Sequence, residues 1–297
     1  MTSVTPASTH KFAAGESRIA GQNNLTGYLV SAIAVFIGAL MLAPLVLSFF
    51  ASIKSPVEAS AVPPSYFPSS LSLENYNNVL HFGAGLGTYV GNSLGVAALA
   101  IIFSLALSVP AGFGLARFQI PYKELLFVVL LTPLMIPYQA LLTPLYFMFA
   151  KLNLANSLIG LAVVHTILQI PFSVYLMRNA FEAVPRELEE AAVIDGCSTF
   201  VSFRRVFLPL AIPGMVTVAL FAFIASWNEF LAALIFMNKE TSFTVPIMLV
   251  SVRIGHFGSV DWGALQAGIL ISILPCALIY IFLQKYYVSG LLGGAVK

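Results

Sequence analysis

The sequence predicts an all-α membrane protein with six transmembrane helices and one large cytoplasmic loop. Three observations indicate this fold class. Of the 297 residues, 59% are hydrophobic and 9% are charged, whereas soluble domains carry about 25% charged residues. Several uncharged runs exceed the ~20 residues that a helix needs to cross a bilayer. The segment 182–209 is the exception, because it alone holds Glu182, Glu187, Glu189, Glu190 and Asp195 of the 12 acidic residues.

The six spans follow from the apolar runs in chain order. A polar tail over residues 1–24 is expected to be cytoplasmic. The spans then cover residues 25–50, 88–116, 125–150, 152–177, 211–237 and 262–284. Four prolines between residues 52 and 87 indicate an exposed loop, and residues 151–153 a tight turn. We expect residues 25–288 to form one membrane domain and residues 289–297 a cytoplasmic C-terminal tail.

The distribution of basic residues orients the spans. Six spans place both termini on one side. With the N-terminus inside, the inner segments hold ten of the 14 basic residues and the outer segments hold four. This asymmetry fits the positive-inside rule and places the loop 182–209 in the cytoplasm.

The third span contains three prolines, Pro133, Pro137 and Pro144. Each removes a backbone donor and kinks a helix, so the freed carbonyls need neighbours or water. We therefore expect this span to line an interior rather than to face lipid, with Tyr138 and Gln139 beside the middle proline. Proline-tolerant packing is an equally weighted alternative.

Glu229 is the only carboxylate inside a predicted span. A charge at the bilayer centre costs about 2.5–3.5 kcal/mol on insertion scales, so the side chain should face a polar interior or be protonated. A structural ion pair or hydrogen bond with a neighbouring helix is the alternative. Other polar residues in the spans, among them His165 and Gln169, are expected to make helix–helix hydrogen bonds.

The loop 182–209 predicts two short helices. Pro185 suits a first helical turn, acidic residues follow it at the positive end of the helix dipole, and Gly196 supplies a left-handed stop. A helix is therefore expected over residues 185–195. A second helix should carry Phe200, Phe203 and Phe207 on one stripe, as in helices that lie in a membrane interface.

The spelling of this loop resembles a known family. Glu190-Ala191-Ala192, then Gly196, nine residues, Val206 and finally Leu208-Pro209 is similar to the EAA loop of ABC-importer permeases, with Val206 in place of the usual isoleucine. In that family the first helix is the coupling helix, which docks into a cleft on an ATP-binding subunit. The resemblance implies ATPase-docking residues at Glu190, Ala191, Ala192, Asp195 and Gly196.

Two further stretches resemble carbohydrate-importer permeases. Trp227-Asn228-Glu229-Phe230 is similar to the fifth span of these permeases, near the translocation path. The end of the chain, residues 284–297, resembles the tail of the maltose-type second permease. The resemblance implies substrate-path residues at Trp227, Asn228 and Glu229. Tyr138 and Gln139, beside the middle proline of the interior-lining third span, are further candidates for the same path. Trp227 would stack on a sugar face and Asn228 would bond hydroxyl groups.

The resemblance as a whole implies a type I ABC-importer permease fold and a permease subunit of a bacterial sugar or polyol importer in the cell membrane. The implied partners are a second related permease, two ATP-binding subunits and an extracytoplasmic solute-binding protein. The chain lacks a phosphate-binding Gly-x-x-x-x-Gly-Lys-Ser/Thr loop, so we expect no cofactor on this chain, no enzyme activity of its own, and ATP and Mg²⁺ on the partners.

Two classes are excluded or weakened by composition. The net charge of +2 is too small to indicate nucleic acid as a partner. The two cysteines, Cys197 and Cys276, have no metal-ligand neighbours, and we expect neither a disulfide nor a metal site.

Two alternatives stay open. One is an ABC importer of a polyamine, amino acid or phosphate ester, and the other is a stand-alone secondary transporter that uses Glu229 as a proton site.

Overall fold

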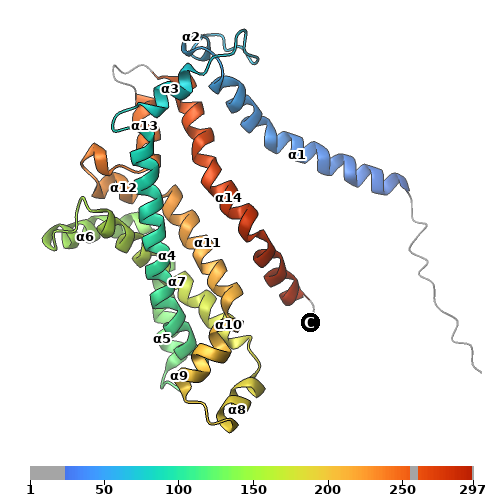
Figure 1. The fold of residues 1–297 in the computed structure, drawn as a ribbon, viewed down its shortest axis with the longest axis vertical. Helices are drawn as coiled ribbons and strands as arrows, with labels where there is room; N and C mark the ends of the chain where they lie inside the picture. Colours follow the sequence, from blue (N-terminus) through green and yellow to red (C-terminus); the bar gives the residue numbers. More distant parts are fainter. Residues whose placement is uncertain (1–23, 255–259, 296–297) are drawn as a thin grey trace, which may run out of the picture. The chain divides into compact units, whose positions relative to one another are not determined.

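The computed structural model describes residues 24–254 and 260–295, with side chains over 27–254 and 260–282. The described chain is helical and contains no β-strand (Figure 1), so the all-α fold class is confirmed. The chain forms two compact units, residues 1–47 and 48–297. The predicted tail, residues 1–24, lies outside the described residues except for its last residue.

The first unit contributes one element, the beginning of helix α1 (Asn24–Ser52). From Gly27 to Ser52 the helix is uncharged and long enough to cross a membrane, as the apolar run predicts. Most of its large side chains are exposed, which is the surface that a lipid-facing helix presents.

The second unit contains all other described elements. In chain order they are the helices α2 (Pro56–Ala59), α3 (Glu74–Leu80), α4 (Leu86–Arg117), α5 (Lys123–Leu131), the 3-10 turn η1 (Thr132–Met135), α6 (Tyr138–Lys151), α7 (Leu158–Glu182), α8 (Arg186–Ile194), α9 (Thr199–Ser202), the π-helical turn η2 (Phe203–Phe207), α10 (Leu208–Leu210), α11 (Ile212–Asn228), α12 (Leu231–Phe236), the 3-10 turn η3 (Glu240–Ser242), α13 (Val245–Ile254) and α14 (Trp262–Ala295).

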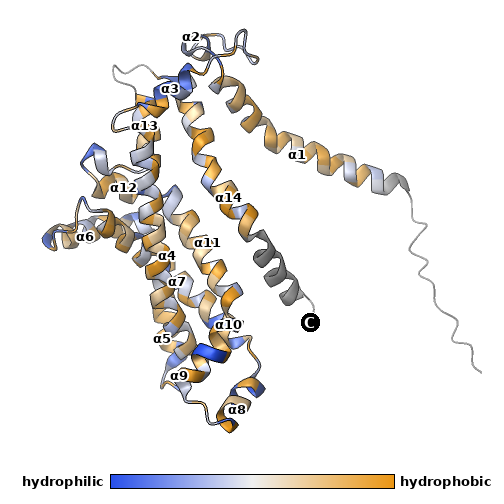
Figure 2. Cartoon of the chain, in the orientation of Figure 1, coloured by the Kyte–Doolittle hydropathy of each residue, from blue (hydrophilic) through white to orange (hydrophobic). Residues whose placement is uncertain are grey.

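The predicted spans are found, with corrections at their ends. Four described helices are long and apolar enough to cross a membrane, or six spans if each of two bent pairs counts as one. Figure 2 shows apolar residues along α4, α11 and α14 and polar residues at the end that carries α8 and α9. The fourth span was placed too early, because α7 begins at Leu158. Asn153 and Asn156 adopt positive φ before it, and the Ser157 side chain caps its first turn.

The third span is broken rather than kinked. Its two halves, Lys123–Met135 and Tyr138–Lys151, meet at 98°. Ile136 between them is extended, with φ −91° and ψ 129°, which is the conformation that the following proline favours. Pro133 starts the 3-10 turn, whereas Pro144 stays inside α6. The break therefore comes from Pro133 and Pro137, and the expected kink within one helix over 125–150 is instead a break between two helices.

Close backbone contact joins the central helices. The most extensive contact in the second unit is between α4 and α7. Gly112 of α4 makes it possible, since an added Cβ there would lie 2.6 Å from the Met177 Cβ and 2.8 Å from the Arg178 nitrogen. Gly214 plays the same part between α11 and α7, where a Cβ would lie 2.5 Å from the Ala180 Cβ. Small residues at such crossings are typical of helix packing in membranes.

The connection between α2 and α3 is exposed but ordered by one carboxylate. Glu58 accepts hydrogen bonds from the Ser69 backbone N–H at 2.9 Å, the Ser69 hydroxyl at 2.8 Å and the Ser65 hydroxyl at 3.1 Å. The Ser69 N–H above all, and then these hydroxyls, lower the pKa of Glu58 below its ordinary value. The loop thus gains order from the ionised carboxylate, and this contribution is lost only as the pH falls through the lowered pKa.

Among the helices that were not predicted, which include α2 and α3 in the expected loop 52–87, α13 is the longest. The segment 238–261 reads as a loop, yet it contains α13, which packs against α14 and α4. Val245, Ile247, Met248 and Val252 of α13 are buried. A ten-residue apolar helix is too short to cross a bilayer, so this apolar run does not by itself predict a transmembrane helix.

Candidate functional site

The predicted docking helix is present with the predicted ends. Pro185 is its N-cap and α8 runs from Arg186 to Ile194, with Glu187 and Glu189 in the first turn. Gly196 follows with φ +75°. The Gly196 and Cys197 N–H groups donate to the Val193 and Ala192 carbonyls at 3.0 and 2.9 Å, so orphan carbonyls of the last turn are satisfied by a left-handed cap.

The free face of α8 is both charged and apolar. Glu190, Ala191 and Asp195 are exposed, as docking requires, whereas Ala192 is buried against the rest of the chain. Val193 and Ile194 are 67% and 85% exposed. Two large aliphatic side chains on this short amphipathic helix are therefore not covered by the rest of the described chain. Sequence reasoning missed this aliphatic pair.

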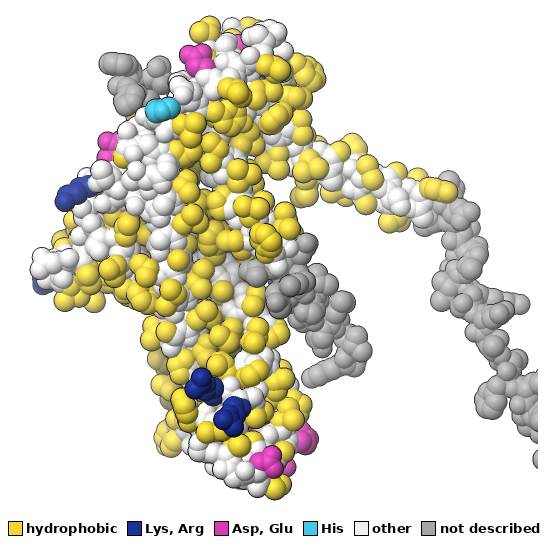
Figure 3. All heavy atoms as spheres, viewed as in Figure 1, with side chains coloured by type: hydrophobic (Ala, Val, Ile, Leu, Met, Phe, Trp, Pro, Cys, Tyr) yellow, Lys and Arg dark blue, Asp and Glu magenta, His cyan; other side chains and the backbone are white. Residues whose placement is uncertain are grey.

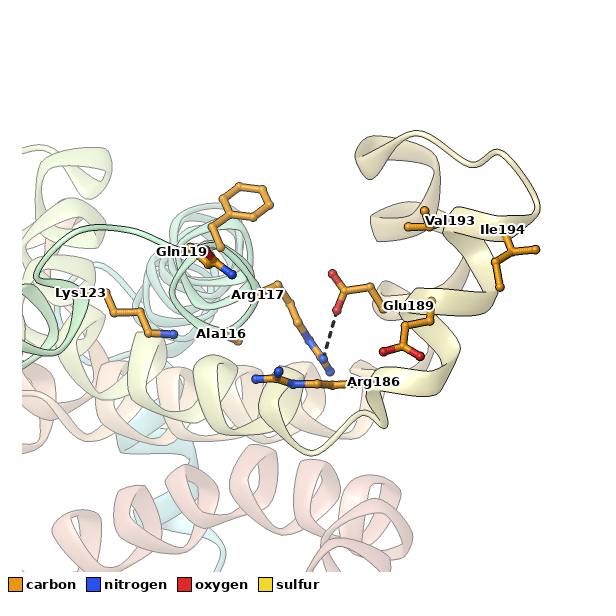
Figure 4. A pocket seen from close by; sticks show the side chains of 10 residues that line it. Ala116, Arg117, Gln119, Lys123, Arg186, Glu189, Val193 and Ile194 are labelled. Atoms are coloured by element: carbon orange, nitrogen blue, oxygen red, sulfur yellow. Dashed lines mark hydrogen bonds and ion pairs between the residues drawn. The ribbon is translucent and has the colours of Figure 1, made fainter.

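A cleft of about 510 Å³ separates α8 from the end of α4 and the segment 118–123. Figure 4 shows the side chains that line it. Arg117 reaches from α4 toward Glu189 of α8, and Arg186 and Lys123 point into the same space. The Arg117 Nη1 atom lies 3.3 Å from the Glu189 Oε2 atom. Sequence reasoning counted Arg117 only as a positive charge at the end of a span, and missed its position inside the cleft.

The second helix of this loop differs from the expectation. Its middle is the π-helical turn η2, and the assembly Thr199–Leu210 meets α11 at 69°. Phe207 is buried and Phe203 packs against the same core, but Phe200 is 69% exposed. The three rings therefore do not share one stripe, because the wider π-turn changes the period after Ser202.

The fifth span breaks at Glu229. Helix α11 ends at Asn228 and α12 begins at Leu231, while Glu229 is extended with φ −72° and ψ 123°. The two carboxylate oxygens of Glu229 accept hydrogen bonds from the N–H groups of Ala232 at 2.8 Å and Ala233 at 2.9 Å. The acid thus caps the N-terminus of α12, where a negative charge is favourable. A continuous helix over 211–237 was wrong.

His165 of α7 joins this break from the neighbouring helix. Its Nδ1 atom lies 2.8 Å from the Ser226 hydroxyl, and its Nε2 atom lies 3.5 Å from the Glu229 Oε2 atom. The side chains of His165 and Glu229 are largely buried, with 4% and 11% exposed. The contact ties α7 to the end of α11. It is the helix–helix hydrogen bond expected for His165, but its place beside Glu229 was not predicted.

A pocket of about 330 Å³ opens at this break. It contains three of the predicted substrate-path residues, Tyr138, Asn228 and Glu229. Four other residues complete its lining: His165, Leu168, Gln169 and Ala225. The lining offers a phenol, two amides, an imidazole and a carboxylate. This set can exchange several hydrogen bonds with a neutral, hydroxyl-rich molecule. Among the described residues, no group of His, Cys, Asp and Glu is arranged to hold a metal ion.

Two predicted substrate-path residues lie elsewhere. Trp227 is 3% exposed, stacks on Phe223 with ring centroids 5.7 Å apart, and donates its indole N–H to the Ser272 carbonyl at 3.1 Å. It therefore packs α11 against α14 and offers no ring face to the pocket. Gln139 lines a separate, mainly apolar groove of about 690 Å³ at the α5–α6 elbow, which Tyr138 also borders.

Comparison with known proteins gives consistent matches. Residues 104–291 match the family described as "binding-protein-dependent transport system inner membrane component". The diacetylchitobiose uptake system permease protein DasC of Streptomyces coelicolor is 33% identical over 271 residues, which cover 90% of this chain and 95% of that protein. The trehalose/maltose transport system permease protein MalG of Thermococcus litoralis is 32% identical over 275 residues, which cover 89% of this chain and 96% of that protein.

The fold also has a solved counterpart. A chain of a bacterial ABC transporter that imports the acidic polysaccharide alginate superposes with a TM-score of 0.77 at 22% identity. The match covers 88% of this chain and 96% of that chain. At this identity the likeness establishes the arrangement of helices alone.

Proposed function

The chain belongs to the inner membrane component family of binding-protein-dependent transport systems, and from this premise we propose that it is a permease subunit of an ATP-driven importer of a sugar or a related polyol or glycoside. The observation that carries the substrate class is the likeness, over about nine-tenths of the chain, to permeases named for diacetylchitobiose and trehalose/maltose. The neutral hydrogen-bonding groups of the pocket support the same class.

The lining of the pocket favours a sugar over the solutes of other ABC importers. It contains no lysine or arginine, and a phosphate ester or a free carboxylate needs a cationic partner. Its one carboxylate, Glu229, accepts a backbone hydrogen bond on each oxygen, so fewer acceptor positions are free for the ammonium groups of a polyamine. Hydroxyl groups need only the amides, the phenol and the imidazole that are present.

The partners follow from the same proposal. A second, related permease completes the translocation path, one of two ATP-binding subunits docks on the α8 face, and a solute-binding protein delivers the sugar from outside. ATP and Mg²⁺ bind to the ATP-binding subunits. Glu190, Ala191, Asp195 and Gly196 lie on the exposed part of α8 and its cap, and the uncovered Val193 and Ile194 side chains add apolar area to the contact.

Transport then proceeds by alternating access. Closure of the ATP-binding subunits moves α8, and the spans attached to it shift the pocket between the two sides of the membrane. Tyr138, Asn228 and Gln169 contact the passing sugar, and Glu229 holds the break in the fifth span that exposes them. The excess of basic residues on the inner segments supports a cytoplasmic position for α8 and for both termini.

A secondary transporter that protonates Glu229 is the competing function. A proton site needs a carboxylate whose hydrogen bonds change with its protonation. Glu229 accepts two backbone N–H groups of α12, which a protonated acid cannot do as well. The capping geometry therefore favours a structural role for Glu229 and an external energy source for transport.

Affinity purification from the native membrane tests this function. A tag on the chain should recover a second permease and ATP-binding subunits, and mass spectrometry of the associated solute-binding protein should identify a bound sugar or polyol. Recovery of the chain without any ATP-binding protein, under conditions that keep its spans folded, would contradict the proposal. An amino acid or polyamine on the binding protein would contradict the substrate class alone.

A further inference from the structure

Arg117 occupies a position that the docking surface does not explain. It is the last residue of α4, yet its side chain is only 5% exposed. Its Nη2 atom donates to the Phe181 carbonyl at 2.6 Å and to the Val184 carbonyl. Both carbonyls belong to the end of α7 or the residues just after it, where a helix presents unpaired acceptors and the negative end of its dipole. Arg117 thus fastens the end of α4 to the end of α7.

The same guanidinium reaches two further segments. Its Nη1 atom forms the 3.3 Å ion pair with Glu189 of α8. Its Cζ atom lies 4.7 Å from the ring centroid of Phe207 in the π-turn η2, within the range of a cation–π contact. A planar group with several fixed donors is suited to hold such a junction, whereas an ammonium group is not. One side chain therefore contacts α7, α8 and η2 and belongs to α4.

Few other contacts connect α8 to the spans. Its covalent links run through residues 183–185 to α7 and through Gly196 to α9, and a Cβ on Gly196 would meet nothing within 4 Å. Within the described residues, α8 and α4 are joined by the side-chain hydrogen bond and ion pair between Arg117 and Glu189, which lie 72 residues apart in sequence. A displacement of α8 away from α4 must therefore break this pair or carry the end of α4 with it.

We infer that Arg117 is the positioning residue through which movement of the docking helix α8 reaches the spans α4 and α7. The inference rests on the proposed function, because it needs α8 to be moved by a partner. Beneath Arg117, Phe113 packs on Phe181, Phe203 and Phe207 with centroids 5.4, 4.7 and 5.2 Å away. This aromatic cluster makes the ends of α4, α7 and η2 one packed body, so a pull on the guanidinium moves that body as a unit.

Arg178 offers a matched control. It is also largely buried, with 11% of its side chain exposed, and it carries two ion pairs, to Glu124 at 2.8 Å and Glu182 at 2.7 Å. Its Cζ atom lies 4.2 Å from the Phe127 ring. These contacts join α7 to α5 and do not involve α8. Arg178→Gln therefore removes a buried arginine of the same kind without cutting the link to the docking helix.

The test uses the complete complex in proteoliposomes and measures sugar taken up per ATP hydrolysed, together with subunit co-purification. Arg117→Gln should retain the ATP-binding subunits but lower this ratio about fivefold or more, the lower end of typical coupling between sites. Arg117→Lys should also lower the amount of sugar taken up per ATP hydrolysed, but less than Arg117→Gln. Glu189→Gln, which cuts only the bond to α8, should lower it less than Arg117→Gln. Arg178→Gln should keep the wild-type ratio.

Three results would overturn the inference. They are a wild-type ratio in Arg117→Gln, an equal loss in Arg178→Gln, and disassembly of Arg117→Gln combined with a wild-type ratio in Glu189→Gln. Each would mean that Arg117 serves folding alone. A wild-type complex that takes up no sugar with ATP would instead contradict the proposed function, so the two failures are distinguishable.

Discussion

At the scale of single residues, Glu229 illustrates how one acid can organise a membrane site. Placed in lipid it would be costly, but here two N–H groups of α12 satisfy its oxygens and His165 lies beside it. The acid thus stabilises a break in a helix, and the break exposes Asn228 and Ala225 to the pocket. We therefore expect the polar side chains around Glu229, rather than the carboxylate itself, to contact the transported molecule.

Two alanines on the same helix test which face of α11 meets the pocket. Ala225 is exposed and lines the pocket, whereas Ala222, one turn earlier, is 2% exposed. In a chain with Cys197 and Cys276 replaced, Ala225→Cys should react with a membrane-impermeant thiol reagent in at least one nucleotide state. Ala222→Cys should stay unlabelled in every state. Equal labelling at the two positions, or none at Ala225→Cys, would contradict the pocket.

The sequence predicted part of this site. Tyr138, Asn228 and Glu229 lie in one pocket. They could be singled out beforehand because prolines within a span, and an acid within an apolar run, both indicate a departure from a plain lipid-facing helix. The orientation of Trp227 was not accessible, because it depends on a partner on α14, the Ser272 carbonyl. The role of Arg117 was missed for a similar reason. A basic residue after a span is normally a topological signal, and only the folded chain shows it turned inward.

At the scale of helices, the long spans were predictable and their interruptions were not. Apolar length determines whether a helix crosses the membrane, so α1 and α4 were found near their true bounds. The start of α14 was also found, but the helix continues to Ala295, past the predicted end at residue 284 and into the segment predicted as a tail. The breaks at residue 136 and at Glu229 depend on how the freed backbone groups are satisfied, and at Glu229 the carboxylate itself accepts hydrogen bonds from the N–H groups of Ala232 and Ala233. The docking helix α8 was found almost residue by residue, since proline, acids and glycine mark its ends locally.

Gly112 tests the α4–α7 contact. Gly112→Ala places a Cβ 2.6 Å from the Met177 Cβ, so the helices must separate, and overpacking of this kind typically costs about 1–3 kcal/mol. The melting temperature of the purified protein in detergent should fall. Gly95→Ala is the control, because it lies in the same helix and its Cβ would meet nothing within 4 Å. If both variants melt alike, the contact does not limit stability.

Gly196 tests the cap of the docking helix. Its φ of +75° suits glycine, and the surrounding space is open, so a side chain there is opposed by backbone strain alone. Gly196→Ala should cost about 1–2 kcal/mol locally, and Gly196→Pro should be worse because proline cannot adopt positive φ. Stimulation of ATP hydrolysis by the loaded binding protein should decline in that order while the spans stay inserted. Wild-type stimulation in Gly196→Pro would refute the assignment.

At the scale of the whole molecule, the second unit separates recognition from energy supply. The pocket lies at the break between α11 and α12. The proposed docking helix α8 lies in the loop between α7 and α11. In Figure 3, hydrophobic side chains cover much of the visible face between the two ends, as expected of a surface in a bilayer. The tightly packed helices α4 and α7 connect the two regions.

Glu190 tests attachment of the ATP-binding subunits to the whole chain. Glu190→Lys should weaken it, since a cation in the first half of α8 opposes the helix dipole and any basic group of the partner. Repulsion between exposed charges is screened by salt, so co-purification should be poorest at low salt and recover partly at moderate salt. Glu74→Lys, at an exposed position of α3, should retain the partner at both. Normal attachment of Glu190→Lys with lost sugar transport would contradict the docking role.

The most direct test of the central claim is uptake of radiolabelled sugar into proteoliposomes that contain the reconstituted complex. The ligand found on the binding protein is supplied outside, and ATP with Mg²⁺ is trapped inside. We expect uptake that requires both internal ATP and the loaded binding protein and that persists when the proton gradient is collapsed. Uptake by the chain without ATP-binding subunits, driven by a proton gradient and abolished in Glu229→Gln, would contradict the account.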